Sequence, residues 1–161
     1  MWGYIQSTAS NLQQNIGDPP NVAGWPAYYQ APQFYEIWIN ADTLPKRNQF
    51  TDRFAGSGYT RNGSTILIDP IAFADGLSNP ADPNVLINDS LAMMYSIPVS
   101  QALKDFLKTI LLSGQSTDIY WTSAWTDYKN NPSNASFYKI VLTRLLAFYK
   151  YLMNLAEYQL T

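Results

Sequence analysis

The closing segment of the chain, residues 136–159, constrains the fold more than any other stretch. Its apolar side chains recur every three or four residues, which is the spacing of one face of an α-helix: Phe137, Val141, Leu145, Phe148, Leu152 and Leu155. A second apolar group broadens this stripe: Ile140, Leu142, Leu146, Tyr149 and Met153. So wide a stripe predicts a helix that is enclosed by neighbours on several sides. Burying about six such side chains at roughly 1.5–3 kcal/mol each contributes on the order of 10 kcal/mol before entropy, so we expect the domain to unfold without this helix.

Apolar periodicity and helix-capping residues predict further helices upstream. Asn40 or Asp42 can cap one of them, with Pro45 in its first turn, and Ser100 and Gly114 bound another. The expected helices are residues 2–16, about 42–54, 70–77, 84–95, 100–113 and 118–128. In the helix over 118–128, the aromatic residues can alternate between buried and exposed faces.

We therefore predict an all-α or nearly all-α fold, a single helical domain over residues 1–161. About six helices pack around the C-terminal helix. One long loop rich in proline and aromatic residues, 18–32, lies near the start. Residues 63–69 are β-prone, which leaves room for one short strand pair, and residues 34–39 fit either a strand or a helical turn.

The chain contains no cysteine and no histidine. Without histidine, a serine–histidine triad within this chain is impossible, and the commonest general base and metal ligand is absent. Without cysteine, disulfides, thiolate nucleophiles and cysteine-based zinc sites are excluded. We predict no metal site, no cofactor and no catalytic residue in this chain.

The charge pattern restricts the partners. Ten basic and twelve acidic residues give a net charge of −2, and the basic residues are scattered along the chain. A nucleic-acid-binding protein normally carries a clustered positive stripe, so we expect no nucleic acid partner. No apolar run reaches the roughly 18 residues of a membrane-spanning helix, so we expect no membrane span.

Three segments together resemble the C-terminal portion of an uncharacterised bacterial family, domain of unknown function 1800. The first is Pro-Pro-Asn-Val-Ala-Gly-Trp-Pro over residues 19–26, followed by Trp38-Ile39-Asn40 and by Leu44, Arg47, Asn48 and Phe50. The second is Leu-Leu-Ser-Gly-Gln over residues 111–115, leading to Tyr120-Trp121-Thr122. The third runs from Arg144-Leu145-Leu146 to the ending Ala-Glu-Tyr-Gln-Leu over residues 156–160.

The resemblance implies that this chain corresponds to roughly the last third of a longer protein, whose larger N-terminal part is missing here. The N-terminus has no signal sequence, and it opens directly in an expected helix. Members of the family are typically exported, so the resemblance implies a periplasmic, cell-surface or extracellular location. Their genes often neighbour those of another exported family that is related to sulfatases. The family has no established catalytic residues to carry over.

The loop over residues 19–26 and its aromatic neighbours are the leading binding candidates. A rigid loop can present Asn21, together with Asn40 downstream, to a ligand or to the missing N-terminal region. The aromatic residues can stack on sugar rings: Trp25, Tyr28, Tyr29 and Trp38, with Phe34 and Tyr35 between them. The alternative is structural, because prolines stiffen a loop and large aromatic rings gain by burial in a core.

The carboxylates near unusual loops are Asp18, Glu36, Asp42 and Asp69. A pair of them could perform acid–base chemistry, but Asp18, Asp42 and Asp69 each have an ordinary capping or turn role, which is the interpretation we favour. Three functional hypotheses follow. The first is that the chain is a non-catalytic module that completes the missing N-terminal region or binds another exported protein. The second is that it binds a glycan through exposed aromatic rings. The third is that it is part of an enzyme whose other catalytic residues lie outside it.

Overall fold

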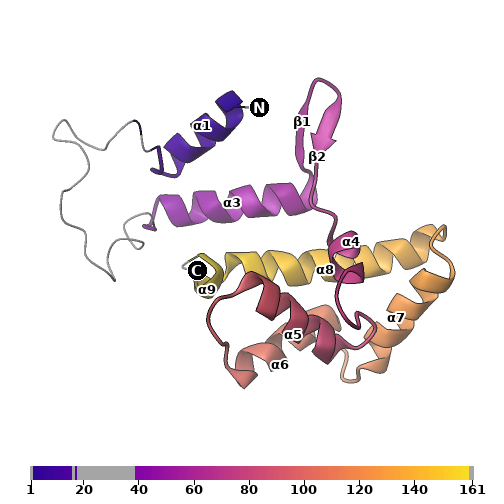
Figure 1. Cartoon of the computed structure of the whole chain (residues 1–161). Helices are drawn as coiled ribbons and strands as arrows, with labels where there is room; N and C mark the ends of the chain where they lie inside the picture. Colours follow the sequence, from indigo (N-terminus) through magenta and orange to yellow (C-terminus); the bar gives the residue numbers. More distant parts are fainter. Residues whose placement is uncertain (1, 16, 18–38, 160–161) are drawn as a thin grey trace. The chain divides into compact units, whose positions relative to one another are not determined.

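The computed structural model describes residues 2–15, 17 and 39–159, and this part of the chain is mainly helical (Figure 1). Its elements, in chain order, are α1 (Trp2–Asn11), α3 (Thr43–Gly56), β1 (Tyr59–Arg61), β2 (Ser64–Ile66), α4 (Pro70–Asp75), α5 (Pro83–Met94), α6 (Gln101–Leu111), α7 (Ile119–Asn130), α8 (Ala135–Asn154) and α9 (Ala156–Gln159). The predicted fold class is confirmed, with eight helices and one strand pair among the described residues.

The chain divides into two compact units, one up to Thr51 and one from Asp52 to Gln159. The single domain over residues 1–161 stays a prediction. The first unit holds α1 and most of α3. The predicted extent of α1 is wrong, because the helix ends at Asn11 and not near residue 16. Gln13 takes a left-handed conformation (φ 58°), and the N–H of Gln14 donates to the carbonyl of Ala9 over 2.8 Å, which closes the helix as a C-terminal cap.

The start of α3 follows the prediction that Asn40 or Asp42 caps it. Asn40 is the residue that does so, because its Oδ1 accepts from the backbone N–H groups of Asp42 and Thr43 over 2.9 and 3.0 Å. Asp42 instead forms an ion pair with Lys46, one helical turn later, at 2.7 Å. Pro45 lies in the first turn, where its missing N–H is tolerated.

Strands β1 and β2 pair antiparallel, with Tyr59 opposite Ile66. The two residues between them, Asn62 and Gly63, both have positive φ (51° and 79°), which is the two-residue turn that matches the twist of a hairpin. The sequence predicted β structure for residues 63–69, and strand β2 lies within that range. The short strand pair that the prediction allowed is therefore present, although residues 59–61 were not predicted as its other strand.

Helix α8 forms the centre of the second unit and contacts α4, α6, α7 and α9. Val141, Leu145, Phe148 and Leu152 are completely buried, as its stripe predicted. The predicted breadth of the stripe is wrong at Ile140, which is 44% exposed. At about 100° per residue, Ile140 lies a quarter-turn from the buried line through Val141, so it reaches the surface instead of the core.

The same buried core includes apolar residues of the other helices and of the loops that follow them: Ala55, Ile71, Ala74, Leu86, Ile87, Leu91, Tyr95, Leu107, Leu111, Leu112, Trp121 and Trp125. On α7 the predicted alternation is confirmed, because Trp121 and Trp125 are buried whereas Tyr120 is exposed. On α6, Phe106 was predicted to be buried but is 48% exposed, and its ring lies against Tyr151 with the centroids 5.2 Å apart.

The predicted continuous helix over residues 136–159 is interrupted. Helix α8 ends at Asn154, Leu155 is extended (φ −71°, ψ 148°), and α9 follows as a separate turn. Carbonyls in the last turn of a helix have no partner within it. The carbonyl of Leu152 accepts from the backbone N–H of Leu155 over 3.2 Å and also from the hydroxyl of Tyr95 over 2.7 Å, which ties the end of α8 to the residue that follows α5.

Candidate functional site

The binding candidates that the sequence predicted lie mostly in residues 18–38, outside the described residues: Asn21, Trp25, Tyr28, Tyr29 and Trp38. Asn40 is described. Its Oδ1 caps α3, and its Nδ2 donates to Oε1 of Gln13 over 3.2 Å. Both ends of this side-chain amide therefore have partners within the first unit, which is a structural role.

The carboxylates that the sequence singled out also have structural partners where they are described. Oδ1 of Asp69 accepts from the backbone N–H groups of Ile71 and Ala72 and so caps α4. Asp42 pairs with Lys46, while Asp18 and Glu36 lie outside the described residues. Within the part of the chain that is described, no group of three or more acidic residues is placed to hold a metal ion.

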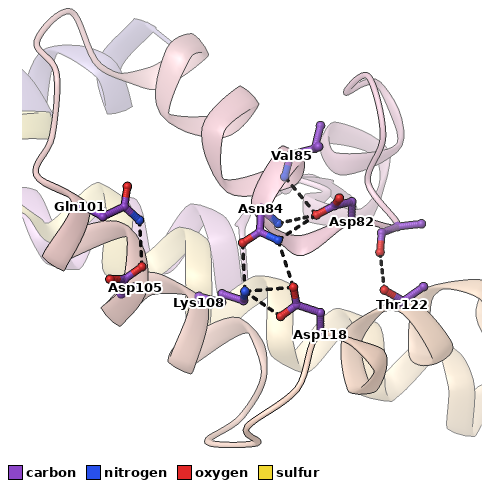
Figure 2. Close-up of polar contacts among 9 residues, drawn as sticks. Asp82, Asn84, Val85, Gln101, Asp105, Lys108, Asp118 and Thr122 are labelled. Atoms are coloured by element: carbon purple, nitrogen blue, oxygen red, sulfur yellow. Dashed lines mark hydrogen bonds and ion pairs between the residues drawn. The ribbon is translucent and has the colours of Figure 1, made fainter.

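A cluster of polar side chains joins α5, α6 and the start of α7 (Figure 2). Nζ of Lys108 lies 2.7 Å from Oδ1 and 2.9 Å from Oδ2 of Asp118, and 3.0 Å from Oδ1 of Asn84. Nδ2 of Asn84 in turn donates to Oδ2 of Asp118 and to Oδ1 of Asp82, the cap of α5. The hydrogen bond from Lys108 holds the pKa of Asp118 below its ordinary value, so this carboxylate stays ionised.

A second set of polar contacts lies one helical turn away along α5 and α6. Nζ of Lys104 donates to Oδ1 of Asn88 over 2.8 Å, and Nε2 of Gln101 donates to Oδ1 of Asp105 over the same distance. The hollow between these two sets of polar contacts has a volume of about 170 Å³. Because its lysines and asparagines already satisfy one another across α5 and α6, we interpret this cluster as a link between helices and not as a ligand site.

The second family-like segment also has structural explanations. Ser113 and Gly114 are both left-handed (φ 53° and 77°), and the N–H of Gly114 donates to the carbonyl of Thr109, which terminates α6. Nε1 of Trp121 donates to the carbonyl of Pro80 over 2.8 Å. Oγ1 of Thr122 donates to the carbonyl of Ala81 over 2.8 Å. These bonds fasten α7 to the loop that precedes α5.

A different kind of feature lies between α7 and α8. One face of each helix lines a groove of about 320 Å³, which we call the α7–α8 groove: Ile119, Tyr120, Ser123, Ala124, Asp127, Phe137, Ile140 and Arg144. Its large apolar side chains are well exposed, with Ile119 at 60%, Tyr120 at 48% and Ile140 at 44%. None of these three belongs to the buried stripes of its helix, so the helical core does not require an apolar residue at these positions.

Arg144 lies at one end of the α7–α8 groove. Its Nη1 donates to the carbonyl of Tyr120 over 2.8 Å, which brings the second and third family-like segments together. This bond uses one of the five N–H donors of the guanidinium and fixes its position. Burial lowers the pKa of Arg144 from its ordinary value, although arginine remains charged in proteins.

A second hollow of about 430 Å³ lies on the other side of Ile140 and Arg144. The rest of its lining consists of Ser113, Ser136, Lys139 and Thr143. It thus holds two cations and three hydroxyl groups but no carboxylate. Neither hollow was predicted from the sequence. No local pattern pointed to one, because Ile140 was assigned to the buried stripe of the C-terminal helix and Ile119 was not singled out.

These observations define a mainly helical protein without cysteine or histidine, in which the described polar clusters fasten helices together. Comparison with known families identifies it further. The chain belongs to the family described as "Protein of unknown function (DUF1800)", which matches residues 2–160 and confirms the resemblance found in the sequence. Comparisons with curated proteins and with solved structures found no match. Among the described residues, no helix is long and apolar enough to cross a membrane.

Proposed function

We propose that this chain is a non-catalytic module that binds a protein segment through the α7–α8 groove. The observation that carries the proposal is the exposure of Ile119, Tyr120 and Ile140 around one concave surface. Contiguous apolar surface that is left open to water marks interaction sites in folded proteins. Following the family resemblance, the partner is the remainder of a longer exported protein or another exported protein.

The organisation of the two helices supports this proposal. Trp121 and Trp125 on α7, and Val141 and Leu145 on α8, already supply the buried faces. The groove residues lie on another face of each helix. About half of the surface of Ile119, Tyr120 and Ile140 stays exposed to water, and a partner that covers this remaining surface adds apolar burial.

A glycan is the second candidate, because two aromatic rings, Tyr120 and Phe137, line the same groove. Aromatic faces are common platforms for sugar rings, but hydroxyl-rich sugars also need several hydrogen-bond partners. The lining offers Ser123, Asp127 and Arg144 for that purpose, among otherwise apolar side chains. The apolar balance therefore favours a protein segment.

The test is selection of a random linear peptide library on the chain, followed by affinity measurement of the enriched peptides by fluorescence polarisation. Replacing Ile119 and Ile140 together by glutamine should weaken these peptides at least about tenfold, because central apolar anchors dominate interfaces. Met93→Gln is the matched control, since Met93 is a 70% exposed apolar residue on α5, away from the groove. Failure to enrich any peptide, or equal binding to the Ile119/Ile140 variant, would contradict the proposal.

A further inference from the structure

We propose that the segment bound in the α7–α8 groove is acidic as well as apolar, and that one of its carboxylates is held by Arg144 and Lys139. This inference rests on the proposed function and names the chemistry of the partner. It follows from the charges around the ridge that Ile140 and Arg144 form between the two hollows.

The lining of the two hollows carries more positive than negative charge. The two hollows together contain the cations Lys139 and Arg144 and the single carboxylate Asp127. Asp127 lies two helical turns along α7 from Tyr120, whose carbonyl holds Arg144, so it occupies the other end of the groove. The end around Arg144 is therefore positive, on a chain whose net charge is −2.

Neither of the two cations in this lining is neutralised by a carboxylate of the described residues. The other lysines near this region are engaged: Lys108 with Asp118, and Lys129 with Asp75 at 2.6 Å. Lys139, in contrast, forms no ion pair or hydrogen bond with the described residues. Arg144 is held by a backbone carbonyl, which fixes its guanidinium without neutralising it. A planar fork held in place in this way matches a carboxylate bidentately at little cost in side-chain entropy.

Hydroxyl groups lie beside these cations in the second hollow. Ser136 and Thr143 line the second hollow and can donate to a bound anion. Ile140 lies between this hollow and the apolar groove. A partner that places an acidic residue beside a bulky apolar residue would satisfy both sides of the ridge at once.

The test uses the peptides enriched on the unmodified chain. We expect them to carry aspartate or glutamate beside a large apolar residue. Arg144→Gln should weaken their binding about tenfold or more, and Arg144→Lys should recover only part of it, because lysine keeps the charge but not the fork. Replacing the peptide's acidic residue by its amide should cause a similar loss, and the two changes together should lose less than the product of the separate effects.

The control is Arg61→Gln, which removes an exposed arginine on strand β1. Circular dichroism melting of each variant checks that the fold is retained. Enriched peptides that lack acidic residues, or that bind Arg144→Gln as tightly as the unmodified chain, would overturn this inference. If the same peptides still lose binding on replacement of Ile119 and Ile140, the proposed function survives that result. Binding on a glycan array that is lost in Tyr120→Ala, without any peptide binding, would overturn both.

Discussion

The phenol of Tyr149 gives the sharpest prediction about the core, because its burial makes stability depend on alkaline pH. Tyr149 is 5% exposed, between the rings of Phe73 and Phe148, and its hydroxyl shares a hydrogen bond of 3.2 Å with the buried hydroxyl of Ser90. Burial raises the pKa of Tyr149 from 10.0 to about 12. The folded state therefore keeps its proton at a pH where the unfolded chain has lost it.

The magnitude follows from linkage. Stability from this group is fully present below the unfolded pKa of 10.0 and is lost as pH rises towards about 12. At about 1.36 kcal/mol per pKa unit, the loss reaches roughly 1.4 kcal/mol near pH 11. Tyr149→Phe removes this dependence. At neutral pH the variant is less stable by about 1–3 kcal/mol, because the buried Ser90 hydroxyl loses a partner.

The assay is urea unfolding of the unmodified chain and of Tyr149→Phe at about pH 8 and about pH 11. The stability difference between the two proteins should shrink by roughly 1.4 kcal/mol at the higher pH. Phe148→Leu is the control, because it disturbs the same part of the core without an ionisable group, so its deficit should not change with pH. A Tyr149→Phe deficit that stays constant from pH 8 to pH 11 would refute the reasoning.

Three further predictions concern stability. Leu145→Ala deletes a completely buried side chain at the centre of α8 and should lower the unfolding free energy, measured by urea titration, by about 2–5 kcal/mol. A loss below about 1 kcal/mol would contradict the central place of α8 in the core. Gly58→Ala should weaken the β1–β2 hairpin and speed its hydrogen exchange, because Gly58 has φ 72° and an added Cβ would collide with the carbonyl oxygen of Ile66. Unchanged hydrogen exchange would contradict this geometry. Asp118→Asn should lower the thermal midpoint only slightly, because its ion pair with Lys108 is partly exposed, and the effect should decrease in high salt. A large, salt-independent loss would contradict a partly exposed, screened ion pair.

Much of the helical framework could be predicted from the sequence, because its determinants are local. Ser100, Asp69 and Asn40 cap the helices that follow them, and prolines occupy first turns, as their backbone preferences dictate. The buried stripe of α8 follows from spacing alone. Such features depend on residues within one or two turns, so a single sequence contains the information.

The errors share a physical cause, which is that they depend on residues distant in sequence. Ile140 and Phe106 carry the same apolar signal as their buried neighbours, and only the packing of other helices decides that they are exposed. The end of α8 at Asn154 is stabilised by the hydroxyl of Tyr95, more than fifty residues away in the sequence. The α7–α8 groove needs two helices, so no local pattern could reveal it.

The most direct test of the account is a nuclear magnetic resonance titration of the isotopically labelled chain with an enriched peptide. We expect chemical-shift changes to concentrate on the groove faces of α7 and α8, with the methyl groups of Ile119 and Ile140 and the guanidinium of Arg144 among the most affected. Shifts that instead concentrate on the polar cluster around Lys108, or that leave Ile140 and Arg144 unmoved at saturation, would contradict it.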